Sequence, residues 1–282
     1  LLIQGMSVYS IIIPAHNEAP VISRTLAKLT KSLDFDKAEV IVVCNGCKDD
    51  TAAQASRFKG VKVISIEEAS KPAALNEGDR SATGFPRAYM DADIDVDGAE
   101  LCRAMSEAGR DGVEIVCPSS FYDCSQSSIF VKSFYAVWTA LPHKMVGAGI
   151  YIISEQGRGR FGEFPKITSD DGYARENFNE EEQRTSKQCT TRIYAPRTLG
   201  DLIKIKTRAR FGNMELNKKY PKFKAGGENG AKAIVSYVLG RPWMIFAACL
   251  YVWIQLQTKK HARKRMENQD FGTWERDESS RC

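Results

Sequence analysis

The chain lacks a long uninterrupted hydrophobic run, and we expect no secretory leader. Residues 1–7 are too short and too poor in charge to form a signal peptide. The most apolar stretch, residues 233–256, is interrupted by Pro242, and residues 242–256 span only 15 positions. Because a helix needs about 20 apolar residues to cross a bilayer, a simple transmembrane span is not expected.

The eight cysteines form no recognisable disulfide or zinc pattern. In a long chain without an expected leader, they favour reduced thiols in a cytosolic setting. Cys44 and Cys47 have the C-x-x-C spacing of thioredoxin-like motifs, but the sequence has no second C-x-x-C pair to complete a four-cysteine zinc site. A redox or metal-binding role for this pair is a minor alternative.

Strong net charge, internal repeats and low-complexity tracts are also missing. A formal net charge of +5 over 282 residues does not indicate a nucleic-acid partner. With 43% hydrophobic and 27% charged residues, the composition is that of a globular protein with one large domain, or one domain and an appendage. Much of the positive excess lies in residues 259–265, a run that by itself is typical of a solvated helix face.

The first 120 residues show a regular alternation of apolar strands and helical segments. Strands are predicted at residues 8–13, 39–43, 61–66, 87–90 and 113–117, and helices at residues 17–29, 49–58 and 72–81. Pro14 is expected to end the first strand, and Asn17 to cap the first helix. Alternating strands and helices imply right-handed βαβ units and a parallel sheet, so the predicted fold class is α/β.

Polar residues follow three of the predicted strands, namely His16-Asn17-Glu18, Asn45 to Asp49 and Asp91-Ala92-Asp93. Ligands of open α/β sheets bind at the carboxyl ends of the strands, so we expect these clusters to share one cleft. Each cluster alone could be a polar turn or a helix cap. Asp91 and Asp93 could together hold a hard divalent cation, and such a cation is suited to binding a diphosphate.

The second half of the chain is less regular. A helix is predicted at residues 127–141, a strand at residues 150–153 and a flexible basic loop at residues 157–160. Ser169-Asp170-Asp171 precede the expected start of another helix, where Ser and Asp are favoured as capping residues.

The apolar stretch 233–256 has features of a membrane interface. Trp243, Trp253 and the basic run after Thr258 are typical of such an interface, with the basic side cytoplasmic. A shallow or re-entrant hairpin, or a helix in the membrane plane, fits this stretch better than a span. The alternative is a core helix packed against the domain.

Together, these motifs resemble family-2 glycosyltransferases with the GT-A fold. Residues 10–18 (SIIIPAHNE) resemble the opening strand and donor loop, residues 42–51 (VVCNGCKDDT) the second strand, residues 71–78 the K-x-x-A-L-N-x-G segment, and residues 91–93 the D-x-D motif. Ser169-Asp170-Asp171 resemble the acidic pair that holds the catalytic base. The resemblance covers roughly residues 8–215. Residues 161–178 and 274–277 look similar to bacterial members of the polysaccharide and cell-envelope type.

The resemblance implies a Rossmann-like, mostly parallel central sheet flanked by helices. A GT-A domain would occupy residues 1–225, with a nucleotide-sugar half at about 1–120 and an acceptor half at about 121–225. Residues 226–282 would form an apolar, helical, membrane-associating segment with a basic tail.

The resemblance also implies the residues of the site. A nucleotide-diphosphate sugar donor would be bound by Pro14, Ala15, His16, Asn17, Glu18, Asn45, Asp49, Lys71, Asn76, Asp91, Ala92 and Asp93. Asp93 and Asp91 would hold Mg²⁺ or Mn²⁺ on the diphosphate. Asp171 would act as general base on the acceptor hydroxyl, with inversion at the anomeric carbon. Asp170, Arg208 and Arg210 are expected on the acceptor or phosphate side.

Two positions depart from the family pattern. Cys44 stands where members often carry an acidic residue that contacts uracil, which leaves the nucleotide base open. Residues 207–211 match the Q-x-x-R-W motif of processive members only in part, so a single addition is expected.

The expected function is therefore metal-dependent, inverting sugar transfer to a glycan or lipid-linked acceptor, at the cytoplasmic side of the cell membrane and without a nucleic-acid partner. Two alternatives stay open. One is nucleotidyl transfer on the same type of fold, which also uses an acidic metal site. The other is a non-catalytic, membrane-associated scaffold that has kept the fold.

Overall fold

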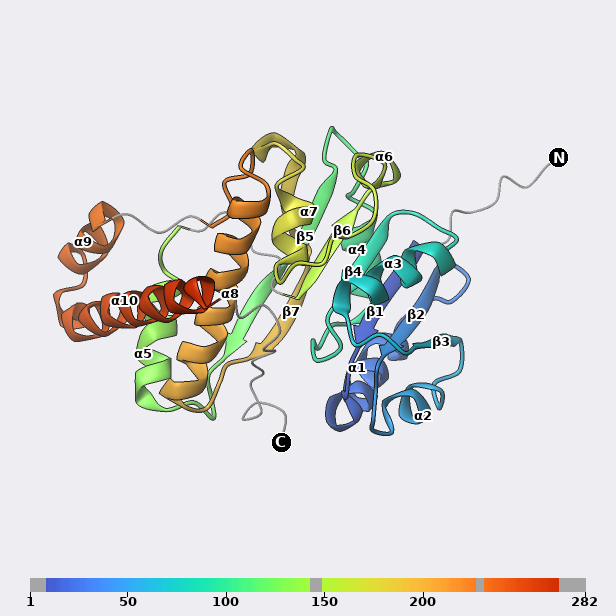
Figure 1. Cartoon of the computed structure of the whole chain (residues 1–282), viewed down its shortest axis with the longest axis horizontal. Coiled ribbons are helices and arrows are strands. Elements are labelled where there is room, and N and C mark those ends of the chain that lie inside the picture. Colours follow the sequence, from blue (N-terminus) through green and yellow to red (C-terminus); the bar gives the residue numbers. More distant parts are fainter. Residues whose placement is uncertain (1–8, 143–148, 227–230, 269–282) are drawn as a thin grey trace. The chain divides into compact units, whose positions relative to one another are not determined.

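The computed structural model describes residues 9–142, 149–226 and 231–268. Its strands are β1 (Tyr9–Ala15), β2 (Ala38–Asn45), β3 (Val61–Ile66), β4 (Arg87–Met90), β5 (Ile115–Asp123), β6 (Ile150–Ile153) and β7 (Gln183–Tyr194). Its helices are α1 (Ala19–Lys31), α2 (Thr51–Ala55), α3 (Lys71–Ser81), α4 (Gly98–Met105), α5 (Ile129–Trp138), α6 (Glu155–Arg158), α7 (Asp170–Arg175), α8 (Leu199–Lys219), α9 (Ala231–Leu239) and α10 (Ile245–Glu267). Figure 1 shows these elements in chain order.

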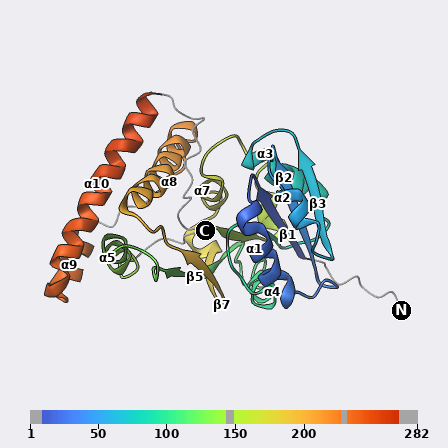
Figure 2. The same ribbon diagram turned by 90° about the horizontal axis from the view of Figure 1, so that it is seen from below.

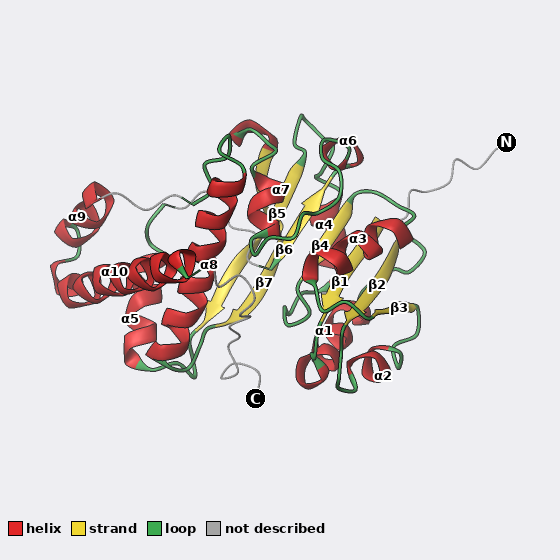
Figure 3. Ribbon diagram, viewed as in Figure 1, coloured by secondary structure: helices red, strands yellow, loops and turns green. Residues whose placement is uncertain are grey.

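The strands form one seven-stranded sheet with the order β3-β2-β1-β4-β6-β5-β7 (Figure 3). The first four strands are parallel neighbours, with β1 lying between β2 and β4. Strand β6 runs antiparallel to both β4 and β5. This mostly parallel sheet with flanking helices confirms the predicted α/β class.

The ends of the first strand and first helix differ from the prediction. Strand β1 continues through Pro14 to Ala15, because β4 pairs only with residues 10–12 of β1 and leaves that side of Pro14 unpaired. A proline is tolerated where its missing N–H faces no partner strand. Asn17 does not cap α1: it has a positive φ of 51°, and Glu18 is the N-cap residue.

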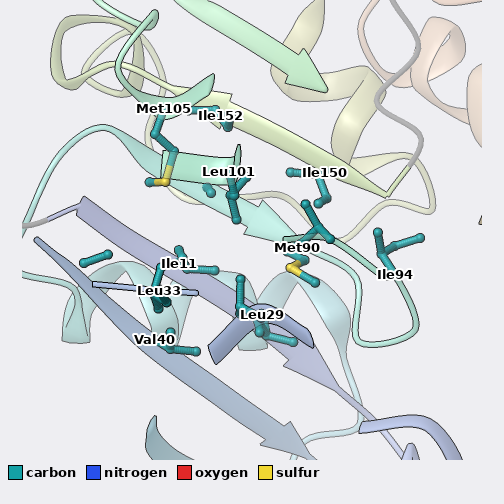
Figure 4. Close-up of a cluster of buried hydrophobic side chains, with 14 of the residues drawn as sticks. Ile11, Leu29, Leu33, Val40, Met90, Ile94, Leu101, Met105, Ile150 and Ile152 are labelled. Atoms are coloured by element: carbon teal, nitrogen blue, oxygen red, sulfur yellow. The ribbon is translucent and has the colours of Figure 1, made fainter. Parts of the chain in front are cut away.

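Apolar residues on the two faces of β1 and β2 contact different helices. On one face, Ile11 and Val40 pack with Leu29 of α1 and Leu101 of α4, and Figure 4 shows this cluster. On the other face α3 lies very close, since a Cβ built at Gly78 would approach Cγ2 of Ile12 to 2.3 Å. Helices therefore cover both faces of the parallel part of the sheet, as continuous apolar strands require.

Residues 157–160 are not the flexible basic loop that was predicted. Arg158 ends helix α6, and its guanidinium contacts Asp79 of α3 at 2.6 Å. Arg87 of β4 contacts the other oxygen of Asp79 at 2.8 Å, and the Tyr89 hydroxyl donates to the same carboxylate. The three charged side chains are only 9–13% exposed, so this ion cluster fastens α3 and α6 to β4 inside the protein.

Replacing Asp79 by alanine is expected to lower the free energy of unfolding by about 3–5 kcal/mol, because two guanidinium groups lose their buried partner. Denaturant titration measures the change. Asp34→Ala is the matched control, since the Asp34–Lys37 pair is about half exposed, and water and salt screen such pairs so that they contribute little to stability. Equal losses for the two variants would contradict a stabilising role of the buried cluster.

The described residues fall into two compact units. The first lies within residues 1–121, 147–166 and 177–193, and the second within residues 122–146, 167–176 and 194–282. The domain division expected from the sequence, with a boundary near residue 225, stays a prediction.

The core of the second unit lies among three helices. Helix α10 packs against α8 and α5, and Figure 2 shows α10 running alongside α8. Tyr251 of α10 stacks on Phe134 of α5 with ring centroids 5.2 Å apart. One face of α10, which forms the second half of the apolar stretch 233–256, thus packs in a protein core, as predicted by the alternative of a core helix. Among the residues that the structure describes, no helix is long and apolar enough to cross a membrane.

Candidate functional site

The three polar clusters predicted to share a cleft lie at one edge of the sheet. Strands β2, β1 and β4 are parallel neighbours, so their carboxyl ends point the same way (Figure 1). Pro14 and Ala15 end β1, Asn45 ends β2, and Asp91 directly follows β4. The structure therefore brings together the three clusters, which are up to 77 positions apart in the sequence (residues 16–93).

Side-chain hydrogen bonds connect the loop after β1 to the loop after β2. The ring Nδ1 of His16 donates to the main-chain oxygen of Asn45. The Asn45 amide donates in turn to the main-chain oxygen of Ala15 at 3.0 Å. The Asn17 side chain accepts a hydrogen bond from the N–H of Lys48 at 2.7 Å. These contacts fix the conformation of both loops at the sheet edge.

Asp49 accepts hydrogen bonds from the starts of two helices. Its carboxylate accepts from the N–H of Ala19 and from the N–H of Thr51, both at 3.1 Å. Burial alone would raise the pKa of Asp49, but the hydrogen bonds from Thr51 and Ala19 outweigh it and lower the pKa. Glu18 belongs to the same network, since its N–H donates to the Thr51 hydroxyl at 2.8 Å. Asp49 is therefore an ionised anchor for both loops.

The C-x-x-C pair does not have the properties of a redox site. Cys44 is 2% exposed, and burial, followed by the neighbouring Cys47, raises the pKa of its thiol to about 12. A protonated, buried thiol is a poor nucleophile and a poor metal ligand at neutral pH. Cys47 donates to the Ala15 oxygen at 3.4 Å, so this pair contributes to the packing between the two loops.

The end of β4 combines two carboxylates with a lysine. Lys71 is the first residue of α3, and its Nζ lies 2.7 Å from Oδ1 of Asp91. Both side chains are partly exposed, at 22% and 39%. Ala92 is 4% exposed and packs into the core, which separates the two carboxylates of Asp91 and Asp93 by a buried residue. Gly149 accepts from the N–H of Asp91 at 2.8 Å and holds the start of this turn.

Asp95, which the motifs did not identify, fixes the turn from the other side. This buried carboxylate contacts Arg24 at 3.1 Å and Lys28 at 2.6 Å, both on α1. Arg24 also donates to the main-chain oxygen of Asp93 at 3.2 Å. The four-residue spacing of Arg24 and Lys28 on one helix face was the only sequence signal for this contact.

The side chain of Asn76 forms two hydrogen bonds with the main chain of Phe164. Its amide donates to the Phe164 oxygen at 3.0 Å and its side-chain oxygen accepts from the Phe164 N–H at 2.7 Å. A hollow of about 760 Å³ lies beside this contact, between α3 and residues 163–166. Its lining has four carboxylates, from Glu67, Glu68, Glu77 and Glu163, and two cations, from Arg80 and Lys166, which pair with three of them. The net charge of this lining is negative, which does not favour a diphosphate.

The predicted acceptor-side residues lie in the second unit. Asp170 and Asp171 are the first two residues of α7, and the Ser169 hydroxyl donates to Asp171 at 3.1 Å. Asp170 is only 3% exposed, whereas Asp171 is partly accessible to solvent. Gly212 of α8 lies close to this segment, since a Cβ built there would be 3.1 Å from Cβ of Ser169. Close packing on α8 thus holds the start of α7.

Arg208 and Arg210 lie two positions apart on α8, so their side chains leave the helix in different directions. Arg210 donates to the side-chain oxygen of Gln255 on α10 at 3.1 Å. Arg210 therefore lies against α10. The roles of all the predicted site residues stay predictions.

Three comparisons place the chain among known proteins. Residues 10–162 match the model of glycosyl transferase family 2. The glycosyltransferase AglE of Haloferax volcanii is 33% identical over 113 residues, which cover 38% of this chain and 37% of AglE. The chain thus aligns with little more than a third of the length of this curated relative.

Solved structures with a similar fold include two sugar transferases. The mannosyltransferase PcManGT from Pyrobaculum calidifontis, in complex with GDP-Man and Mn²⁺, has a TM-score of 0.59 at 19% identity and covers 96% of this chain and 77% of that chain. Glucosyl-3-phosphoglycerate synthase from Mycobacterium tuberculosis, in complex with phosphoglyceric acid, has a TM-score of 0.54 at 18% identity and covers 76% of this chain and 80% of that chain. At these identities the likeness concerns the fold.

Proposed function

Because the chain belongs to glycosyl transferase family 2, we propose that it transfers a sugar from a nucleotide-diphosphate sugar to an acceptor hydroxyl. One observation carries this proposal. The carboxyl ends of β1, β2 and β4 lie side by side at one edge of the sheet, and Asp91 and Asp93 follow β4 there. Similar folds have been solved with GDP-Man and with UDP-glucose, which supports a donor of this class.

The two carboxylates after β4 fit a divalent cation that is shared with a substrate. Mg²⁺ is commonly held by one or two carboxylates together with substrate phosphates. Among the described residues, no group of three or more His, Cys, Asp or Glu side chains could hold a metal by itself, so a cation here needs other ligands. We propose that Asp93 and Asp91 hold Mg²⁺ or Mn²⁺ on the donor diphosphate. When bound, the cation would offset the negative charge of the leaving nucleoside diphosphate.

Lys71 competes for the same carboxylate. Its ammonium lies 2.7 Å from Asp91, where a cation would also bind. Replacing Lys71 by methionine is therefore expected to raise the affinity for Mn²⁺ alone by roughly tenfold, since one cation no longer has to be displaced from Asp91. The same variant is expected to bind donor more weakly, because a positive charge near the phosphates is lost.

Isothermal titration of Mn²⁺ into the donor-free protein measures this effect. Lys48→Met is the control, because it removes one exposed positive charge from the loop after β2, whereas the ammonium that pairs with Asp91 belongs to Lys71. An affinity of Lys71→Met for Mn²⁺ equal to that of the wild type would show that Lys71 does not compete with the cation.

We propose that Asp171 takes the proton from the acceptor hydroxyl. Its partial exposure at the start of α7 makes it accessible, whereas its buried neighbour Asp170 is not. The assignment is supported by the resemblance of residues 169–171 to the acidic pair of the family. Attack by the activated hydroxyl opposite the leaving group inverts the anomeric carbon.

The acceptor is proposed to be a glycan or a lipid-linked molecule at the cytoplasmic face of the cell membrane. The exposed apolar surface of α10 and its basic continuation support a membrane location. The similarity to bacterial members of the polysaccharide and cell-envelope type stays a prediction, and its residues 274–277 lie outside the described part of the chain.

A screen of nucleotide sugars by thermal unfolding, with and without Mn²⁺, tests the proposed donor class. A donor at 100 times its dissociation constant stabilises a protein by about 2.7 kcal/mol, which corresponds to a rise in Tm of several degrees. We expect at least one nucleotide-diphosphate sugar to raise Tm only when Mn²⁺ is present. If none of them changes Tm with Mn²⁺, the donor proposal is wrong.

A further inference from the structure

Exposed apolar side chains are concentrated near the C-terminus of the described chain. Among the residues that the structure describes, twelve large hydrophobic residues are exposed, and eight of them lie from Val235 to Leu256. They are Val235, Leu239, Trp243, Ile245, Phe246, Val252, Trp253 and Leu256, with exposed fractions from 38% to 85%. Such a concentration of exposed apolar side chains in one segment is typical of an interaction surface.

Helix α10 has two apolar faces with different environments. Its buried residues, which include Ala248, Tyr251 and Ile254, pack in the core of the second unit. At 3.6 residues per turn, the exposed residues Ile245, Phe246, Val252, Trp253 and Leu256 all lie on the opposite side, within a sector of about 120°. The core therefore does not use this side of the helix. We refer to these five residues as the α10 stripe.

The α10 stripe continues into positive charge along the same side of the helix. Lys260, Arg263 and Lys264 are exposed and fall in the same sector, within the next two turns. The only acidic residue of α10 is Glu267, its last residue. An apolar surface is thus followed directly by a cationic one on a single helix face.

A hollow beside the cationic end adds room for an anionic group. It has a volume of about 510 Å³ and lies between α8 and the last turns of α10. Lys204, His261, Lys264 and Arg265 line it, and its lining contains no carboxylate. The positive charge of this part of the second unit is therefore suited to phosphate-bearing headgroups.

We propose that the α10 stripe and the adjoining cations bind the surface of an anionic lipid bilayer. The stripe would enter the hydrocarbon edge, while Lys260, Arg263 and Lys264 contact lipid phosphates. From Ile245 to Leu256 the helix rises about 17 Å, so the stripe extends over about three turns in the plane of the membrane surface. Trp243 and Trp253 are residues that favour this interface.

A second copy of the chain is the competing occupant of the α10 stripe. A bilayer fits the surface better, because anionic lipids supply both apolar tails and negative phosphates. If α10 of a second copy packed on this side, it could place only one acidic residue, Glu267, against these cations. Binding of α10 to a bilayer would account for the membrane location in the proposed function. The role of this binding in sugar transfer rests on that proposed function.

Flotation of the full chain with vesicles of neutral phosphatidylcholine, with or without 30 mol% phosphatidylglycerol, tests the proposal. We expect binding to the anionic vesicles, weakened by high salt. Phe246→Glu/Trp253→Glu is expected to abolish binding. Lys260→Glu/Arg263→Glu/Lys264→Glu is expected to lower the partition coefficient at least 100-fold, since each cation near an anionic surface contributes about 1 kcal/mol, or about fivefold, and the charge reversal adds repulsion.

Phe121→Glu is the matched control, because Phe121 is 54% exposed on β5 and lies outside the α10 stripe. It is expected to float like the wild type. Thermal stabilisation by donor and Mn²⁺ should be unchanged in all three variants, which separates this proposal from the proposed function. Equal flotation of wild type and Phe246→Glu/Trp253→Glu would overturn it. So would a wild-type dimer in sedimentation velocity that binds no vesicles and dissociates in that variant.

Discussion

Asp171→Asn is expected to lower the rate of sugar transfer about 10²–10⁴-fold while donor binding is retained, because a general base contributes about this factor. Asparagine has nearly the same shape as aspartate but cannot take the proton of the acceptor hydroxyl. Ser169 can still donate a hydrogen bond to the amide oxygen, so the start of α7 keeps its conformation. The loss should therefore appear in kcat and not in folding.

Rate measurements with saturating donor, together with thermal stabilisation by donor and Mn²⁺, test this prediction. Asp201→Asn is a matched control, since Asp201 is also a carboxylate in the first turn of a helix of the second unit. Asp201→Asn is expected to keep nearly full activity. Wild-type rates in Asp171→Asn would remove Asp171 from the role of base.

Asp93→Asn is expected to reduce transfer by roughly 10²–10³-fold and to remove the dependence of donor stabilisation on Mn²⁺. A bound cation stabilises developing charge by several kcal/mol, and each 1.4 kcal/mol changes the rate tenfold. An amide is a weaker ligand than a carboxylate for a hard cation. Donor and cation binding should therefore weaken together in this variant.

Asp50→Asn is the control for Asp93→Asn, because Asp50 is an exposed carboxylate after β2 and its side chain makes no capping hydrogen bond. Thermal unfolding with donor at increasing Mn²⁺ compares the two variants with the wild type. If Asp93→Asn keeps the Mn²⁺ dependence of the wild type, the cation is not held by Asp93.

The strands were predictable where the apolar run is continuous and turn residues bound it. Strands β3, β4 and β6 have the predicted bounds of residues 61–66, 87–90 and 150–153. Strands β1 and β2 extend further than predicted, because Ala15 pairs with Cys44 and Asn45 pairs with Ile66 of β3. Strand ends set by pairing with a distant segment leave no mark in the local sequence.

The misassigned segments depend on partners that are far away in the sequence. Local composition predicts a flexible loop at Arg158, but its partner Asp79 lies 79 positions earlier. Local sequence predicts a helix cap at Asn17, but its side chain accepts a hydrogen bond from Lys48 in the next loop, and its φ is positive. Local propensity cannot reveal such contacts, because the fold creates them.

The sequence predicts where the candidate site lies, but only some of the contacts that form it. The strand ends indicated the edge of the sheet at which Asp91 and Asp93 lie. They did not indicate that Asp95 fixes this turn through α1, or that Asn76 is engaged by Phe164. The motifs therefore indicate the position of the candidate metal-binding carboxylates, whereas the contacts that hold them in place are visible only in the structure.

Identification of the phosphorus-containing product is the decisive measurement. The full chain is incubated with Mn²⁺ and the nucleotide sugar that stabilises it best, with and without candidate acceptors, and followed by ³¹P NMR. Sugar transfer predicts release of a nucleoside diphosphate that requires Mn²⁺ and is slowed roughly 10²–10³-fold in Asp93→Asn. Release of pyrophosphate, with the nucleotide joined to the acceptor, would show nucleotidyl transfer and contradict the proposed function.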